Sequence, residues 1–265
     1  DELTALVRHK RISYLKLTPS HLIPLLDYAA DKAPLFPGMR AMVVASAPVT
    51  HLQRLAARER LTPNFCEQLG SNETGPLVFG KPADQDAYPE AVGRVVDGVE
   101  AQIVDNDDRP VPAGEVGLTR FRGSGYPTRY LDDPDATARA FRGGWFYPGD
   151  LAALNEEGYL FFKSRADDVI NNAGAKFYPI EVETVLLAHP QVSEAAVFGW
   201  YHTRSGEVAV ACVVAGPAVT TKDLKAFCRQ RIAGYKVPLV IELMAELPRN
   251  AMGKISKSEL KENIE

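Results

Sequence analysis

Apolar positions in the first 61 residues follow a helical spacing in two stretches that flank one unbroken apolar run. Residues 22–29 have the helical spacing, and Ser20 just before them is a residue type that caps helix N-termini. The run 42–45 is short and wholly apolar, which predicts a buried strand. Thr50 then precedes a second helical pattern that ends at Leu61. This alternation of helix and strand predicts an α/β opening segment.

The pattern changes twice further along the chain. From about residue 77 to 163, short β-type runs at 101–104 and 116–119 are separated by turns rich in Gly, Pro and Asp, which predicts a small twisted sheet or barrel. After Arg165, longer helical and strand patterns return. They predict helices at 180–188 and 221–232, and strands at 195–198, 208–214 and 240–243.

These changes predict two domains. Residues 1–164 are expected to form the end of a larger domain, with an α/β segment over about 1–76 and a β-rich subdomain over about 77–163. Residues 165–265 are expected to form a small α+β domain, with the boundary in the polar stretch 164–168. The first residue, Asp1, is not an initiator Met, so we expect a fragment of a longer protein.

Composition and charge narrow the function classes. Of 265 residues, 46% are hydrophobic and 24% are charged, which is typical of a globular protein. The net charge of −4 supplies no basic field for nucleic acid. No apolar run approaches the roughly 20 residues that span a bilayer, and the first residues of this sequence show no basic start leading into an apolar signal core. Three widely spaced cysteines suggest neither a disulfide framework nor a zinc site, so we expect a soluble cytoplasmic protein.

A polar loop bracketed by glycines occupies residues 70–75. Its glycines let backbone amides approach an anion, and Ser71 and Asn72 add side-chain donors. Glu73 offers the hard oxygen ligand that a divalent cation prefers. Taken alone, the segment also fits a structural turn.

Three later segments also carry candidate chemistry. Asp150 follows a Pro-Gly turn, where its carboxylate can accept hydrogen bonds from a pair of hydroxyls such as a ribose diol. The stretch 164–170 fits either a hinge or an ordinary linker. Lys254, beside a glycine, can neutralise a phosphate or a developing oxyanion, or it is a solvated surface lysine. The five histidines show no metal-ligand spacing.

The order of these segments resembles the C-terminal half of the adenylate-forming superfamily: acyl- and aryl-CoA ligases, peptide-synthetase adenylation domains and luciferases. Residues 70–73 resemble its Tyr-Gly-x-Thr-Glu loop, and 145–150 resemble Trp-x-x-Thr-Gly-Asp. Residues 164–183 resemble the Gly-Arg-x-Asp-Asp-x-Ile junction signature, and 247–254 the Leu-Pro…Gly-Lys-Ile loop. Two weaker similarities are Gly125-Tyr126 through Phe141 to a Gly-Tyr…Pro…Thr…Phe spacer, and 45–48 to a Gly-Gly-Ala-Pro turn.

The resemblance implies the fold and the residue roles. The fold would be the end of a large α/β plus β-barrel domain, followed by a small mobile α+β domain. Glu73 would help bind the Mg²⁺ of ATP, and Lys254 would bridge the substrate carboxylate and the α-phosphate. Asp150 and Arg165 would hold the ribose hydroxyls. The other implied positions are Ala45, Ser46, Gly70, Ser71 and Asn72 for nucleotide binding, Asp167 for the hinge, and an Ala173-Gly174 strand for the thiol tunnel.

The chain also departs from the family pattern. Leu69 replaces an aromatic residue that packs on adenine, Asn72 and Pro148 each replace Thr, and Ser164 replaces Gly. The family's Ser/Thr/Gly-rich phosphate loop would lie upstream of this sequence. The upstream half of the same enzyme is therefore an expected partner.

The resemblance implies an AMP-forming acid-thiol ligase. A carboxylic acid and ATP would give an acyl-adenylate, and coenzyme A would then take the acyl group with loss of AMP. One alternative is an adenylation domain that loads a phosphopantetheine carrier protein. An alternative from another class is a non-catalytic nucleotide- or carrier-binding fragment. Neither a nucleic-acid partner nor a membrane span is expected.

Overall fold

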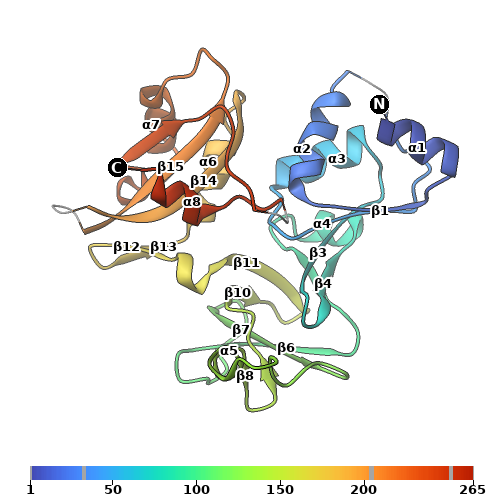
Figure 1. Ribbon diagram of the computed structural model, residues 1–265, viewed down its shortest axis with the longest axis vertical. Helices are drawn as coiled ribbons and strands as arrows, with labels where there is room; N and C mark the ends of the chain where they lie inside the picture. The colour runs from blue at the N-terminus through green and yellow to red at the C-terminus, as the bar shows by residue number, and fades with distance from the viewer. Residues whose placement is uncertain (1, 32–33, 203–205, 251–252, 265) are drawn as a thin grey trace. The chain divides into compact units, whose positions relative to one another are not determined.

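A computed structural model describes residues 2–31, 34–202, 206–250 and 253–264. The chain divides into two compact units, residues 1–163 and 164–265, which are described separately (Figure 1). Within the described residues, no helix is long and apolar enough to cross a membrane.

The first unit opens with three parallel strands in the order β1-β2-β3. In the register of β2 and β3, Ala45 lies opposite Gln68, so the carboxyl ends of these two strands lie side by side. The helices α2 and α3 contact these strands and each other. The elements are α1 (Glu2–Lys10), β1 (Tyr14–Leu17), α2 (Pro19–Tyr28), β2 (Ala41–Ala45), α3 (His51–Arg60) and β3 (Phe65–Ser71).

The two opening helices begin in different ways. Thr50 caps α3 as expected, because its side chain accepts from the Gln53 N–H while the Gln53 side chain accepts from the Thr50 N–H. The expected cap of α2 at Ser20 is wrong: Thr18 holds the cap position, and Ser20 lies inside the helix. Pro19 explains the earlier start, since its fixed φ favours the first turn and its missing N–H would be unpaired there anyway.

The β-rich region continues the same sheet. Among the described residues the sheet has 11 strands, in the order β1-β2-β3-β4-β5-β11-β10-β7-β9-β8, with β6 paired to β7. The strands here are β4 (Gly75–Gly80), β5 (Gly93–Val95), β6 (Val99–Val104), β7 (Val116–Gly123), β8 (Phe141–Arg142), β9 (Trp145–Phe146), β10 (Asp150–Leu154) and β11 (Tyr159–Arg165). The helices here are α4 (Pro82–Ala87) and α5 (Pro134–Ala140).

Two apolar cores stabilise this unit. The first lies between the opening helices and strands and includes Leu22, Met42 and Phe65, all fully buried. The second fills the β-rich region and includes Phe121 and Leu160. Strand β3 takes part in both, because Phe65 belongs to the first core and Leu69 packs against the second.

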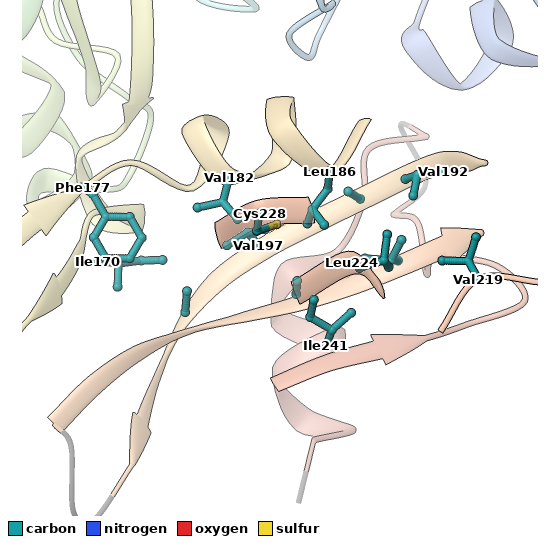
Figure 2. Packing of buried hydrophobic residues seen from close by; sticks show 14 residues of the cluster. Ile170, Phe177, Val182, Leu186, Val192, Val197, Val219, Leu224, Cys228 and Ile241 are labelled. Carbon is teal, nitrogen blue, oxygen red and sulfur yellow. The ribbon is translucent and has the colours of Figure 1, made fainter. Parts of the chain in front are cut away.

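The second unit is an α+β module around a three-stranded sheet. Strands β14 and β15 are antiparallel, and β16 is parallel to β15. Figure 2 shows its core, in which Val182 and Leu186 of α6 and Leu224 of α7 pack toward the sheet. The elements are η1 (Ala166–Asp168), β12 (Ile170–Asn172), β13 (Ala175–Phe177), α6 (Pro179–Leu187), β14 (Val192–His202), β15 (Gly206–Ala215), α7 (Thr221–Arg229), η2 (Gly234–Lys236), β16 (Val240–Leu243) and α8 (Lys257–Glu262).

Candidate active site

The polar loop 70–75 forms the turn of a hairpin between β3 and β4. Ser71 pairs with Gly75, and the Ser71 and Thr74 hydroxyl oxygens lie 3.0 Å apart. Gly70 is required here, because a Cβ at this position would lie 2.2 Å from the Gly75 carbonyl oxygen. The close approach of the two strands leaves Asn72 exposed at the tip of the hairpin.

Glu73 is half-buried on this hairpin and is held by a tyrosine from a distant segment. The Tyr130 hydroxyl donates to Glu73 Oε1 at 2.6 Å. Burial opposes ionisation of Glu73, but hydrogen bonds from Tyr130, from its own backbone and from Ser71 outweigh it, so the pKa of Glu73 is lowered. Burial, with Glu73 adding to it, raises the pKa of Tyr130 to about 12. At neutral pH the site therefore holds an ionised carboxylate and a protonated phenol.

The turn after β2 lies beside this hairpin. Ser46 is exposed and has a φ of 84°, in the left-handed region that a non-glycine residue adopts only at a cost of roughly 1–3 kcal/mol. Ala45 is buried. Since Ala45 pairs with Gln68, the strained turn adjoins the strand that leads into Gly70.

The segment before Asp150 is fixed by stacked side chains. The guanidinium groups of Arg120 and Arg122 lie 4.7 Å and 4.5 Å from the Trp145 ring centroid. Arg120 also donates to the Tyr147 hydroxyl oxygen at 3.0 Å. Asp150 itself begins β10 and is only 9% exposed. This packing fixes Trp145 and Tyr147, the residues that lead into Asp150.

In the second unit, Arg165 and the two aspartates after it have different surroundings. Arg165 Nε lies 3.8 Å from Asp167 Oδ1, and the Asp167 side chain is 81% exposed. Asp168 instead lies 3.7 Å from Lys257 Nζ, which also lies 3.0 Å from Glu183. Asp168 is thus tied to α6 and α8, whereas Asp167 has the solvent exposure that backbone rotation requires.

Ala173 and Gly174 form the turn of the β12–β13 hairpin. Their φ angles are 51° and 93°, so the expectation of an Ala173-Gly174 strand is wrong. Both residues are in the left-handed conformation that such short turns require. The Asn171 side chain accepts from the Gly174 N–H at 3.0 Å. Within its own unit, a Cβ at Gly174 would have open space around it.

A hollow of about 400 Å³ lies beside this hairpin, lined by Asn172 and by residues of α7 and η2. Lys225 and Arg229 contribute cationic side chains, and Tyr235 contributes a ring that is 45% exposed. Asn172 fixes one wall by donating to the Tyr235 carbonyl at 3.0 Å. The Lys225 ammonium donates to the Leu239 carbonyl, which also lines the hollow, at 2.5 Å.

Lys254 lies in a turn that is anchored to strand β14. The Lys254 N–H donates to Asn250 Oδ1 at 3.1 Å, and Arg249 and Ile255 form a bridge across the turn. Arg249 donates to the Gly253 carbonyl at 3.0 Å and forms an ion pair with Glu194 of β14. Lys254 is exposed, and its ammonium forms no ion pair with any of the residues that the structure describes.

The candidate residues are distributed over both units. Ala45, Ser46, Gly70, Ser71, Asn72, Glu73 and Asp150 belong to the first, and Arg165, Asp167, Ala173, Gly174 and Lys254 belong to the second. In the first unit, the register and the hairpin bring the Ser46 turn and the Glu73 loop to neighbouring strands. Across the described ranges, no three His, Cys, Asp or Glu side chains gather as a metal site. A Mg²⁺ ion at Glu73 would therefore take most of its ligands from phosphate and water, as Mg²⁺ commonly does.

Sequence reasoning missed Tyr130 and Arg249. It placed the family's Tyr at Tyr126, whose hydroxyl is buried without a hydrogen-bond partner in the described structure. A usable signal lay in the next helix: the Tyr130 N–H donates to Thr137 Oγ1, and Thr137 donates to the Asp133 carbonyl. Tyr130 is therefore placed by the Asp-Pro start of α5, which is recognisable in the sequence.

Comparison with known proteins finds AMP-binding enzymes and ligases that act on carboxylic acids. Residues 1–131 match the family "AMP-binding enzyme", and residues 181–254 match "AMP-binding enzyme C-terminal domain". A long-chain-fatty-acid–CoA ligase of Escherichia coli O6:H1 is 39% identical over 74% of this chain and 35% of its own length. A 2-succinylbenzoate–CoA ligase of Geobacillus kaustophilus is 43% identical over 85% of this chain and 46% of its own length. The fatty acid–[acyl-carrier-protein] ligase ScoC of Streptomyces coeruleorubidus is 31% identical over 98% and 51%.

Solved structures match nearly the whole chain. The amide bond synthetase McbA from Marinactinospora thermotolerans has a TM-score of 0.90 at 29% identity, over 99% of this chain and 54% of its own. An o-succinylbenzoate CoA synthetase from Bacillus subtilis, with ATP and a magnesium ion, has a TM-score of 0.86 at 26% identity, over 98% and 54%. The chain thus spans about half the length of these relatives, or less. It belongs to the adenylate-forming superfamily of AMP-binding enzymes.

Proposed function

We propose that this chain is part of an AMP-forming ligase that joins a carboxylic acid to a thiol, with coenzyme A as the acceptor. The observation that carries the proposal is Lys254, an exposed lysine on a turn that Arg249 anchors to β14. A solvated surface lysine needs no such anchored turn. The CoA ligase names of the relatives support the same reading.

The first step joins two anions, so the protein must supply positive charge. A carboxylate oxygen attacks the α-phosphorus of ATP, and the bond to the pyrophosphate leaving group breaks. The Lys254 ammonium would contact the carboxylate and the α-phosphate and stabilise the charge that develops between them. Mg²⁺, when bound, neutralises phosphate charge. The ionised Glu73 would hold this ion, since its oxygen donors fit a hard cation and Tyr130 orients one of them.

The ribose would be held by Asp150 and Arg165. Asp150 can accept hydrogen bonds from both ribose hydroxyls, because an ionised carboxylate has acceptors on two oxygens. Its low exposure keeps water from competing for those bonds. Arg165 adds donors from the start of the second unit, where the chain must also rotate if that unit moves between the two steps.

In the second step a thiolate attacks the acyl carbon, and AMP leaves with the electron pair of the broken C–O bond. The hairpin at Gly174 has no side chain to obstruct a narrow ligand such as the pantetheine arm of coenzyme A. The neighbouring hollow, with Lys225, Arg229 and Tyr235, complements the phosphates and the base of the same molecule. Coenzyme A carries three phosphate groups and a carrier-bound phosphopantetheine arm carries one, so we take coenzyme A as the acceptor that these cations fit better.

One relative is named as a fatty acid–[acyl-carrier-protein] ligase, so a carrier protein is the second candidate acceptor. The two acceptors are compared by measuring kcat/KM for coenzyme A and for a phosphopantetheine-loaded carrier protein. A higher value for the carrier protein would move the proposal to the carrier-loading class.

The Lys254→Ala variant, made in the full-length protein, tests the proposal. ATP–pyrophosphate exchange should fall by several orders of magnitude, because the group that stabilises the developing charge is gone. Thioester formation from supplied acyl-adenylate should survive. Lys222→Ala, at an exposed lysine of α7, serves as the matched control and should leave both rates unchanged. Equal losses of both half-reactions in Lys254→Ala would contradict this role, and absence of pyrophosphate exchange in the unaltered protein would contradict the ligase proposal itself.

A further inference from the structure

A buried carboxyl–guanidinium pair lies inside the first unit. Glu67 of β3 and Arg54 of α3 have side chains that are 3% and 7% exposed, and Arg54 Nε lies 2.7 Å from Glu67 Oε2. The contact is an ion pair rather than a linear hydrogen bond, since neither atom meets hydrogen-bond geometry within the described structure. Both charges have therefore lost nearly all contact with water.

Stability alone gives a poor reason for this pair. Removing two charges from water costs several kcal/mol per ion, and well-packed apolar residues in the place of a buried pair are often as stable or more so. Apolar surroundings are available on either side, because Phe65 and Leu69, two residues before and after Glu67, pack into separate cores. An apolar residue at position 67 would join those cores. The retained charge therefore suggests a positional role.

The pair connects three segments. Besides Arg54, the backbone N–H of Val49, in the turn between β2 and α3, faces the Glu67 carboxyl and lowers its pKa. Arg54 also donates through Nη1 to the Pro89 carbonyl, which follows α4, at 2.5 Å. A carboxylate with two acceptor oxygens and a guanidinium with a rigid fork of donors suit such bridging.

Two of these segments lead into proposed nucleotide contacts. Val49 lies three residues after the strained Ser46, and Glu67 lies three residues before Gly70. The register pairs Ala45 with Gln68, so the two strands meet at the level of the ion pair. Any slip of β3 relative to β2 would displace the Ser46 turn and the Glu73 hairpin by different amounts.

We infer that Glu67 and Arg54 are positioning residues for the nucleotide: their ion pair fixes the Ser46 turn and the Gly70–Glu73 hairpin relative to each other. This inference rests on the proposed function in one respect: the proposed function identifies the ligand of the two loops as a nucleotide. Neither side chain is required to touch the nucleotide. Their effect is to hold two loops in the spacing that the nucleotide needs.

The test replaces both charges with apolar side chains in the double variant Arg54→Met with Glu67→Met. The melting temperature should change little, because the buried charges disappear together. The Kd for AMP, measured by calorimetry, and the KM for ATP should each rise about tenfold, which corresponds to about 1.4 kcal/mol. Once ATP saturates the enzyme, kcat should stay within about twofold of its original value. Amide hydrogen exchange should accelerate in residues 46–49 and 69–73 and stay unchanged in β10 and β11.

The outcomes separate this inference from the proposed function. An unchanged Kd for AMP together with unchanged exchange would show that the pair only stabilises the fold. If the double variant does not fold, Arg54→Lys gives the decision: it keeps the charge but loses the fork that reaches Pro89, so the same readouts should move in the same direction. If the unaltered protein binds no AMP, the proposed function fails. The exchange measurement still shows whether the pair holds the two segments.

Discussion

Tyr130 shows how a single hydroxyl can define a proposed cation ligand. Its 2.6 Å hydrogen bond holds Glu73 Oε1 and helps lower the pKa of that carboxyl. Without this bond the carboxylate would keep only its contacts to its own backbone and to Ser71, and its affinity for a cation would fall.

Tyr130→Phe is expected to raise the Mg²⁺ concentration needed for half-maximal pyrophosphate exchange about tenfold, because a hydrogen bond to a charged group is worth about 1.5 kcal/mol or more. Saturating Mg²⁺ should restore most of the rate. Tyr126→Phe is the matched control, since the Tyr126 hydroxyl is buried without a hydrogen-bond partner among the described residues. Identical Mg²⁺ titrations for the two variants would contradict the role given to Tyr130.

Glu67 gives a pH dependence that can be checked without any ligand. Burial raises its pKa to about 7, although Arg54 and the Val49 N–H oppose the change. The folded protein then holds the Glu67 proton more tightly than the unfolded chain does. The stabilising effect of this proton is complete below pH 4.5 and is lost as the pH rises toward 7.

Denaturant unfolding at a series of pH values should show this loss as a fall of about 3 kcal/mol between pH 4.5 and 7. Glu67→Gln, which cannot ionise, should remove that part of the slope. Glu100→Gln should leave it in place, because the Glu100 carboxyl is exposed beside Arg122. The same slope in the Glu67→Gln variant would show that other groups cause it.

Among the structural elements, the turn that carries Lys254 depends on its contacts to β14 for its position. It contributes none of the described strands of the sheet. Two contacts link it to β14: the ion pair of Arg249 with Glu194, and the packing of Ile255 against the cluster that includes Ala196 and Phe198. The Lys254 ammonium can act only if this short segment keeps one conformation. Arg249 is therefore predicted to matter for the rate although it would not touch the substrates.

Arg249→Ala should reduce pyrophosphate exchange by about 10- to 100-fold, the range expected when a reacting group is slightly misplaced. The free energy of unfolding should fall by no more than about 1 kcal/mol, as for other partly exposed ion pairs. Glu194→Gln, which can still accept from Arg249, should show a smaller loss of rate. A full rate in Arg249→Ala would show that the turn holds its shape without the anchor.

Local patterns predicted the elements that depend on local interactions. The strand at 42–45 and the helix after Thr50 were predictable because burial and capping act within a few residues. Strand β3 was not, since its Gly-Ser end looks like a loop until Gly75 approaches Gly70. Tyr130 and Glu73 are 57 residues apart, and Arg54 and Glu67 come from different elements. No spacing rule links such pairs, so these contacts needed the structure.

At the level of the whole molecule, the division between Lys163 and Ser164 lies just before Asp167. Asp168 is held by Lys257, whereas Asp167 is exposed beside Arg165. We propose that rotation around Asp167 changes the orientation of the second unit between the two half-reactions. Each unit has its own core, so a change at Asp167 should affect the connection between the units and leave the fold of each unit unchanged.

Asp167→Pro fixes φ near −65° and should restrict that rotation. One half-reaction, adenylation, should persist while transfer to the thiol fails; single-turnover measurements of each step would show this. Asp167→Ala keeps the backbone free and should support both steps. Wild-type rates of both steps in the proline variant would mean that this residue is only a linker.

The two tryptophans of the chain lie in different units, and their surroundings differ. Two guanidinium groups lie over the Trp145 ring, whereas Trp200 packs at the edge of an apolar cluster. Each unit therefore contains one tryptophan, whose fluorescence can be excited apart from that of the tyrosines. With Trp200→Phe, emission reports only on the unit that carries Asp150; with Trp145→Phe, it reports only on the unit that carries Lys254. Melting followed through each fluorophore would reveal whether the two units unfold together or in sequence, without any added label.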